Sequence, residues 1–200
     1  MIYKAIDENI KKASKLLLDG KIIVYPTDTL LGIGVDATNS DAIEKLNSLK
    51  NRKSPLSIIV GSIRMLKRYA ILTNDAKNYL NKYLPGKFTF LLNQKKSNIS
   101  EKVTVNTDKI GIRIPDSRFI IKVVNYIDRP VITTSINIHG ETPINDINEI
   151  NMKFNNVFIF ANEKKNKSNG STIIDLTGIQ PKLIRNGDGK FSLWKYFLEF

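Results

Sequence analysis

Apolar residues recur along the chain with two spacings, and each spacing predicts one kind of element. Between residues 10 and 17 the intervals are three and four, which is typical of an amphipathic helix that begins after Asp7 and Glu8 and ends at Gly20. The same spacing predicts helices over 40–49, 62–70, 74–84, 116–127 and 146–152, with Ser40 and Asp116 as N-caps. Short apolar or β-branched runs predict strands over 21–25, 56–60, 87–92, 109–114, 130–134, 157–160, 172–176 and 182–185.

The order of these elements predicts the fold class. Helices and strands alternate over the first part of the chain and strands accumulate later, which favours an α/β fold with a mixed sheet. A length of 200 residues fits one domain over 1–200. The polar segment 163–170 is expected to be a mobile loop, because strand patterns flank it. The aromatic segment 191–200 is expected to pack back on the body or, alternatively, to form a dimer contact.

The composition excludes several classes of protein. Hydrophobic residues make up 42% and charged residues 25%, so disordered, collagen-like and coiled-coil chains are excluded. Because cysteine is absent and His139 is the single histidine, disulfides, thiolate zinc sites, cysteine nucleophiles and His-rich metal centres are excluded as well. We expect His139 to be a surface residue without a role. With charges near the N-terminus and no long apolar run, we expect a cytoplasmic protein without a membrane span.

The net charge of +12, from 31 Lys and Arg against 19 Asp and Glu, has two interpretations. It favours a polyanionic partner such as a nucleic acid or a nucleotide. Alternatively, it reflects a general abundance of Lys, Asn and Ile in the composition. Composition does not separate these two.

The segment 32–37 matches the relaxed dinucleotide-binding pattern of spaced glycines, but its context is wrong. In a Rossmann unit the glycines follow the first strand directly, and an acidic residue comes about 20 positions later. Here 26–31 intervene, and 53–59 contain no acid. The Rossmann interpretation is therefore rejected.

Read as a whole, the stretch 24–34 delivers polar groups into a turn at the end of a strand. Thr27, Asp28 and Thr29 follow Pro26, and two glycines then allow close approach of the backbone. Hydroxyls and bare backbone N–H groups suit a small polar ligand. The alternative is a local turn in which the side chains satisfy only their own backbone.

Two further motifs place cations in informative positions. Lys50 and Arg52 follow the second predicted helix, and a lysine beside a guanidinium suits phosphate oxygens. Alternatively, they form a solvated basic helix end that the helix dipole favours. Arg113 lies in an apolar strand, so it either meets an internal acid or faces a ligand carboxylate.

The stretch 133–140 follows a predicted strand. Alternation puts Thr133, Ser135 and Asn137 on one face, where they form a hydrogen-bonding wall if the strand is central. The alternative is an edge strand that faces water.

Taken together, these motifs resemble those of the YrdC-like family, the threonylcarbamoyl-AMP synthases. The resemblance rests on seven motifs in the same order over about 160 residues, at 26–34, 50–52, 84–89, 112–115, 135–137, 171–175 and 185–187. It implies a twisted open α/β sheet flanked by helices around a positively charged concave cavity. It also implies the joining of L-threonine, bicarbonate and ATP, with Mg, into threonylcarbamoyl-adenylate and pyrophosphate. A downstream transferase complex then uses the product to modify adenosine 37 of tRNA.

The resemblance also implies roles for individual residues. Lys50 and Arg52 are the expected catalytic residues, holding the nucleotide phosphates. The further residues expected to contact ATP are Thr89, Ser135, Asn137 and Arg185, with Asn137 near phosphate or Mg. The residues expected to cradle threonine are Thr27, Arg113, Thr133 and Ser171, with Arg113 on the carboxylate.

The chain departs from the family pattern at some positions. Ser57, Ile58 and Ile59 stand where other members carry a histidine that contacts threonine, and Gly170 replaces a glutamate. The stretches 85–92 and 175–189 are similar to the YciO branch. That similarity keeps open an alternative function, the non-catalytic binding of double-stranded RNA or rRNA.

Overall fold

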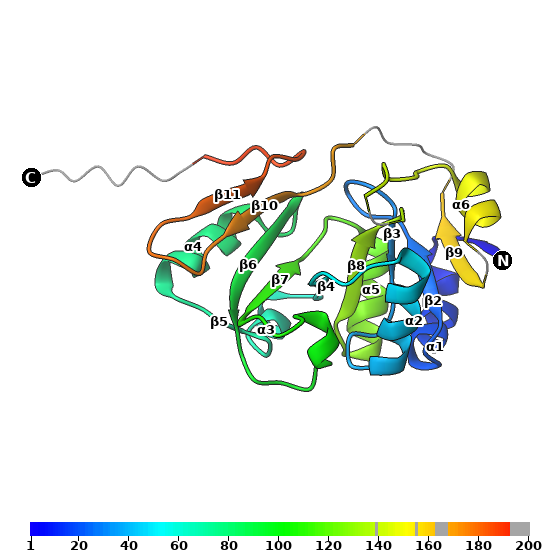
Figure 1. Ribbon diagram of the computed structural model, residues 1–200, viewed down its shortest axis with the longest axis horizontal. Helices are drawn as coiled ribbons and strands as arrows, with labels where there is room; N and C mark the ends of the chain where they lie inside the picture. The colour runs from blue at the N-terminus through cyan, green and yellow to red at the C-terminus, as the bar shows by residue number, and fades with distance from the viewer. Residues whose placement is uncertain (139, 155, 163–167, 193–200) are drawn as a thin grey trace, which may run out of the picture.

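The computed structural model describes residues 1–138, 140–154, 156–162 and 168–192 (Figure 1). Its helices are α1 (Ile10–Leu18), α2 (Ser40–Lys50), α3 (Ile63–Leu66), α4 (Asn74–Tyr83), α5 (Arg118–Ile127) and α6 (Ile147–Lys153). Its strands are β1 (Ile2–Lys4), β2 (Ile22–Tyr25), β3 (Gly32–Gly34), β4 (Ser57–Ile59), β5 (Ala70–Ile71), β6 (Phe88–Gln94), β7 (Lys109–Arg113), β8 (Val131–Ser135), β9 (Val157–Ala161), β10 (Thr172–Asp175) and β11 (Lys182–Arg185). Within these ranges no helix is long and apolar enough to cross a membrane. The expectations for His139, for 163–167 and for 193–200 lie outside the described residues.

The strands join one mixed sheet in the order β1-β9-β2-β3-β8-β4-β7-β6-β10-β11, and β5 pairs with β6 beside this path. β9 runs parallel to β1 and β2, β4 runs parallel to β7, and β10 runs parallel to β6. Neighbours such as β3 and β8, or β6 and β7, are antiparallel. The predicted α/β fold with a mixed sheet is therefore confirmed. Figure 1 shows β9 at one end of the molecule and β11 at the other, with α1, α2 and α5 near the β9 end.

The helices form where their apolar faces are buried, as the spacing predicts. Ala13 and Leu17 of α1 are buried, and α1 packs against α5 and β2. One predicted cap is wrong by a residue: Asn39, not Ser40, caps α2, since its side chain accepts a hydrogen bond from the N–H of Ala42 (3.0 Å). Asn39 has extended backbone torsions, as an N-cap requires, whereas Ser40 already belongs to the helix.

The second cap also differs. Ser117, not Asp116, precedes α5. Its hydroxyl does not cap the helix and donates instead to the carbonyl of Pro26 (2.8 Å), which ties the start of α5 to the turn after β2. The Asp116 N–H donates to the carboxylate of Asp28 (3.0 Å). Both contacts hold the turn after β2 against the loop between β7 and α5.

The glycine pair of the sequence motif forms a strand rather than a loop. Gly32–Gly34 make β3, which pairs with β2 on one side and β8 on the other. A Cβ on Gly34 would lie 1.7 Å from the carbonyl oxygen of Ile132, and one on Gly32 would lie 2.8 Å from the Tyr25 ring. The Tyr25 hydroxyl donates to that same Ile132 carbonyl (2.8 Å). The glycines are therefore needed so that Tyr25 can cross β3 and reach β8.

One predicted helix is shorter than expected. The helix predicted over 62–70 is only α3 (Ile63–Leu66), because the chain then turns into β5.

The start of the aromatic segment packs on α4, where the Phe191 ring lies 5.8 Å from that of Tyr79 and 5.5 Å from that of Tyr83. The Tyr83 hydroxyl also hydrogen-bonds Ser192 (3.1 Å). The expected packing is thus seen for the two described residues of this segment.

Candidate active site

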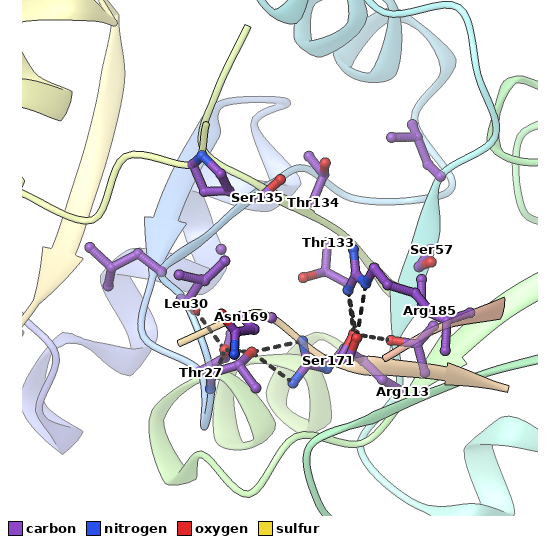
Figure 2. Close-up of a pocket in the computed structure, with 18 of the residues that line it drawn as sticks. Thr27, Leu30, Ser57, Arg113, Thr133, Thr134, Ser135, Asn169, Ser171 and Arg185 are labelled. Carbon is purple, nitrogen blue, oxygen red and sulfur yellow. Dashed lines mark hydrogen bonds between the residues drawn. The ribbon is translucent and has the colours of Figure 1, made fainter. Parts of the chain in front are cut away.

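A cavity of about 200 Å³ is lined by residues of β3, β4, β6, β7, β8, β10 and β11 and of the turn after β2 (Figure 2). Its cations are Arg52, Arg113 and Arg185, and no carboxylate of the described residues lines it. The predicted site residues that line it are Thr27, Arg52, Thr89, Arg113, Thr133, Ser135, Ser171 and Arg185. Lys50 and Asn137 do not. The cavity therefore favours an anionic ligand with hydrogen-bonding groups.

The turn after β2 satisfies its own polar groups. Thr27 donates its hydroxyl proton to the carbonyl of Leu30 (2.6 Å) and accepts from the N–H of Thr29 (3.1 Å). The two threonine hydroxyls lie 3.1 Å apart. Thr27 and Thr29 therefore make the local hydrogen bonds of the turn alternative, but both also line the cavity, and Asp28 bonds outside the turn to Arg113 and Asp116.

Arg113 meets an internal acid, which is one of the two alternatives left open by the sequence, and it also lines the cavity. Its Nη2 lies 2.5 Å from Oδ1 of Asp28, and both side chains are 7% exposed. The Asp28 carboxylate is fixed from its other side by the N–H of Asp116. Burial lowers the pKa of Arg113, and Asp28 opposes that shift. This ion pair holds the guanidinium in one place on the wall of the cavity.

The guanidinium of Arg113 still has unused hydrogen-bonding capacity. Its contacts to the Thr29 hydroxyl are long, at 3.4 Å, and its buried Nε has no partner among the described residues. A buried donor without a partner costs about 1–3 kcal/mol. The long contacts to Thr29 also leave Nη N–H groups that a ligand oxygen in the cavity can accept from.

Three predicted residues from the last strands and β6 form one cluster. Thr89 and Ser171 hydroxyls lie 2.8 Å apart, and Arg185 Nη2 donates to the Ser171 hydroxyl (3.1 Å) and carbonyl (2.7 Å). The sequence-based assignment put Thr89 and Arg185 on ATP and Ser171 on threonine. Because they touch, any ligand that contacts one of them contacts a shared network.

Close packing around Gly187 explains why the 185–187 motif ends in a glycine. A Cβ on Gly187 would lie 2.4 Å from the carbonyl oxygen of Gly170 and 2.5 Å from the carbonyl carbon of Ser171. Its N–H also donates to the Thr172 hydroxyl (3.0 Å). Gly187 therefore lets the chain after β11 lie directly on the backbone that carries Ser171.

The expected position of Lys50 at an exposed helix end is wrong. Its side chain is 1% exposed, because the end of β8 covers the last residue of α2. Its Nζ donates to the carbonyls of Ser135 (2.5 Å) and Asn137 (2.6 Å) and lies 3.2 Å from Asn137 Oδ1. Lys50 therefore does not line the cavity that Arg52 lines.

Arg52 is the member of that pair that lines the cavity. It follows Asn51, which ends α2 in the left-handed conformation (φ 50°) and redirects the chain. Its Nη2 donates to the carbonyl of Pro55 (2.8 Å). Burial lowers the pKa of Arg52, and no carboxylate of the described residues forms an ion pair with it. An anion would therefore compensate this charge.

The turn after β8 is held by Asn137. The Ser135 hydroxyl donates to Asn137 Oδ1 (2.8 Å), and Asn137 Nδ2 donates to the carbonyls of Ile138 (3.0 Å) and Glu141 (2.9 Å). With its amide oxygen already accepting from Ser135 and Lys50, Asn137 offers little to a metal ion. No group of three or more His, Asp or Glu that could hold a metal occurs in the described part of the chain.

Several lining residues were not predicted. They include Ser57, Thr29, Leu30, Gly32, Thr134 and Asn169. Thr29 and Gly32 lie inside a motif that the sequence had already singled out, so position within the motif was the available signal. Ser57 lies in a buried apolar run. The signal there was the family resemblance, because 57–59 stand where other members carry a histidine that contacts threonine, and pairing with β7 and β8 places Ser57 in the cavity.

The profile of the Sua5/YciO/YrdC family, described as "Telomere recombination", matches residues 15–187. The chain belongs to this family. A curated family relative from Wigglesworthia glossinidia brevipalpis, named threonylcarbamoyl-AMP synthase, is 34% identical over 185 residues, which cover 90% of this chain and 94% of the relative.

Solved structures of the Sua5/YciO/YrdC family agree with this fold. The P. abyssi Sua5 protein complexed with L-threonine has a TM-score of 0.82 at 25% identity, over 94% of this chain. The match spans only 56% of that longer chain. E. coli YciO has a TM-score of 0.82 at 23% identity, over 92% of this chain and 91% of its own, which supports the fold alone.

Proposed function

We propose that this chain is a threonylcarbamoyl-AMP synthase, which forms threonylcarbamoyl-adenylate and pyrophosphate from L-threonine, bicarbonate and ATP. The observation that carries the proposal is the convergence of Arg52, Arg113 and Arg185 on one cavity without a carboxylate among its described lining residues. All three substrates carry anionic groups, so such a cavity gathers them and reduces their mutual repulsion. Membership of the Sua5/YciO/YrdC family and the name of the Wigglesworthia relative support the same activity.

The reaction needs no covalent enzyme intermediate. The threonine amine and bicarbonate combine to a carbamate, forming an N–C bond and releasing water. A carbamate oxygen then attacks the α-phosphorus of ATP, the bond to the β-phosphate oxygen breaks, and pyrophosphate leaves. Positioning and cationic stabilisation supply the catalysis in such a phosphoryl-centre displacement. This agrees with a chain that has no cysteine.

The geometry suggests how the substrates divide the cavity. Its volume of about 200 Å³ is below the roughly 300–1,000 Å³ of pockets that enclose drug-sized ligands, so the enclosed part suits an amino acid. Arg113 takes the threonine carboxylate there, and Thr27, Thr133 and Ser171 lie around it. The nucleotide extends from the mouth, with its phosphates near Arg52 and Ser135.

The remaining site residues have supporting roles in this proposal. Arg185 and Thr89 reach the nucleotide through the network they share with Ser171. Lys50 and Asn137 shape the turn that presents Ser135. Mg enters with ATP as part of the substrate. The product, an activated acyl phosphate, is passed to a downstream transferase complex that modifies adenosine 37 of tRNA.

Pyrophosphate release tests this activity. We expect release from ATP only when L-threonine and bicarbonate are both present, with threonylcarbamoyl-adenylate as the co-product in a mass spectrum. Arg185→Ala should lose about 10²–10³-fold in rate, because it removes a cation from the cavity. Lys182→Ala, which changes an exposed cation of the same strand, should leave the rate unchanged. Release that is independent of threonine contradicts the proposal.

A second candidate function, binding of double-stranded RNA, is favoured by another cavity, near the end of β6 and the C-terminus of α5. It is lined by Arg68, Lys95, Lys96 and Arg129, with Asp128 as its carboxylate among the described residues. Asp128 pairs with Arg68, and Asp36 pairs with Arg129. Lys95 and Lys96 form no ion pair with a described residue, so they are the cations that remain for phosphates.

RNA binding has its own test. The affinity for an RNA duplex should fall steeply with salt, by a slope of roughly 0.7–0.9 per phosphate contact. The double variant Lys95→Ala/Lys96→Ala should lower that slope by about 1–2, whereas Lys11→Ala/Lys12→Ala on the exposed face of α1 should not. An unchanged slope in the first double variant removes this surface from the candidates.

A further inference from the structure

The hydroxyl groups that line the candidate active site differ in whether they already donate a hydrogen bond within the protein. Thr27 donates to Leu30 and Ser135 donates to Asn137. Thr89 and Ser171 hydrogen-bond each other. The Ser57 hydroxyl, in contrast, has no hydrogen-bond partner among the described residues, although Ser57 lines the cavity and is only half-buried. Ser57 is therefore free to donate a proton to a ligand.

Thr133 lines the cavity beside Tyr25, since a Cβ on Gly32 would lie 2.8 Å from the Tyr25 ring and 3.3 Å from Thr133 Oγ1. Tyr25 donates its own hydroxyl proton to the carbonyl of Ile132 (2.8 Å), so toward Thr133 its oxygen can only accept. When Thr133 donates in that direction, it presents oxygen lone pairs to the cavity and acts there as an acceptor.

Sheet register places this donor and this acceptor side by side. Ser57 on β4 is the direct cross-strand partner of Thr133 on β8, in an antiparallel pair. Directly opposed residues share one face and have Cβ atoms about 4.5–5.5 Å apart. Figure 2 shows both side chains among those around the cavity, in the region of Arg113 and Arg185.

The same register relates the pair to Arg113. On its other side Ser57 is paired with Gly111 of β7, and Arg113 lies two residues further along that strand. Residues two apart project to the same face, so Ser57, Thr133 and Arg113 all face one side of the sheet. Gly111 leaves the space between them open, because a Cβ there would lie 2.5 Å from the Ser57 hydroxyl.

We propose that Ser57 and Thr133 form the subsite for the carboxyl group that is added to the substrate amine. In this assignment, which rests on the proposed function, Thr133 accepts the N–H of the carbamate and Ser57 donates to a carbamate oxygen. A carbamate offers this donor and this acceptor on a nitrogen and an oxygen that are bonded to the same carbon, in one plane. In this arrangement the amine lies between the carboxylate held by Arg113 and the phosphates near Arg52. Ser57 is the first residue of β4, the strand that follows the loop carrying Arg52.

The dependence of pyrophosphate release on bicarbonate tests this subsite. With threonine and ATP saturating, Ser57→Ala should raise the KM for bicarbonate by about 10–100-fold, the usual effect of losing a hydrogen bond to a charged group. The dissociation constant for threonine, measured by titration calorimetry without bicarbonate, should stay unchanged. Ser57→Thr keeps the donor and should restore most of the wild-type KM.

A matched control is Ser48→Ala, the same change at an exposed position of α2 outside the lining of the cavity, which should leave the bicarbonate KM unchanged. An unchanged bicarbonate KM in Ser57→Ala overturns the proposal. A change confined to threonine affinity overturns it too, since Ser57 would then contact the amino acid itself. If the wild type releases no pyrophosphate in response to threonine and bicarbonate, the proposed function fails instead.

Discussion

The Nζ of Lys50 lies 2.5 Å from the carbonyl oxygen of Ser135, so the last residue of α2 holds the last residue of β8. The same amine donates to the carbonyl of Asn137 (2.6 Å). These contacts fix the turn that presents the Ser135 hydroxyl beside the cavity. The part of Lys50 in the site is therefore indirect, and its substitution acts on stability as well as on activity.

Lys50→Met should lower the free energy of unfolding by about 1–3 kcal/mol, because two half-buried carbonyls lose their donor. Urea denaturation measures this change. Lys45→Met on the exposed side of α2 is the control, and it should stay within about 0.5 kcal/mol of the wild type. Equal stability of the two variants would show that the hydrogen bonds from Lys50 to Ser135 and Asn137 contribute nothing to the free energy of unfolding.

The same residue predicts a pH dependence of stability. Burial, followed by the charge of Arg52, lowers the pKa of Lys50 from 10.5 to about 8. Between these values the unfolded chain binds more protons than the folded one, so this group makes the free energy of unfolding rise with pH. Relative to Lys50→Met, the wild type should gain about 1–3 kcal/mol between pH 8 and 10.5. Denaturation profiles that stay parallel across this range would refute the assignment.

Arg52→Ala should reduce turnover by about 10²–10³-fold while stability changes little. Arg52 lines the cavity and forms no ion pair with a described residue, so its loss removes charge stabilisation of the phosphates. The neighbouring exposed cation gives a matched control, and Lys53→Ala should keep wild-type turnover. Steady-state pyrophosphate release compares the two. If both variants turn over normally, Arg52 is not part of the phosphate site.

Arg113→Lys should weaken threonine binding by about 10–100-fold and change nucleotide binding little. A lysine cannot reproduce the planar fork that pairs with Asp28 and keeps further N–H groups for a ligand carboxylate. Titration calorimetry with threonine, and separately with a non-hydrolysable ATP analogue, measures both affinities. Threonine affinity equal to that of the wild type would assign Arg113 to the ion pair with Asp28 alone.

Local spacing predicts much of this fold because most elements carry their own pattern. The buried residues of α1 and the apolar run of β4 are examples, and both lie where the sequence puts them. The strand Gly32–Gly34 was missed, because glycine has no intrinsic preference for strands and the reason for this one is Tyr25 reaching Ile132, 107 positions away. No window of neighbouring residues contains that information.

The site residues divide in the same way, into those that a local pattern predicts and those that depend on long-range contacts. Arg52 and Arg113 were singled out because a cation after a helix or in an apolar strand is conspicuous, whereas Arg185 was expected from the family resemblance alone. The burial of Lys50 was not predicted, since the chain that covers it comes 85 positions later. Ser57 was given no role from the sequence, although the resemblance marks 57–59 as the place of a threonine-contacting histidine in other members. Its own place in the cavity depends on pairing with Gly111 and Thr133.

The shared network of Thr89, Ser171 and Arg185 has a consequence for biosynthesis. A nascent chain that has emerged only as far as residue 170 holds Arg52 and Arg113 but neither β10 nor β11. β10 must still insert beside β6, more than 80 positions back, before Ser171 can meet Thr89. Such long-range pairing forms late and slowly. On the ribosome, ligand binding to this cavity should therefore begin only after nearly the whole described chain has been translated.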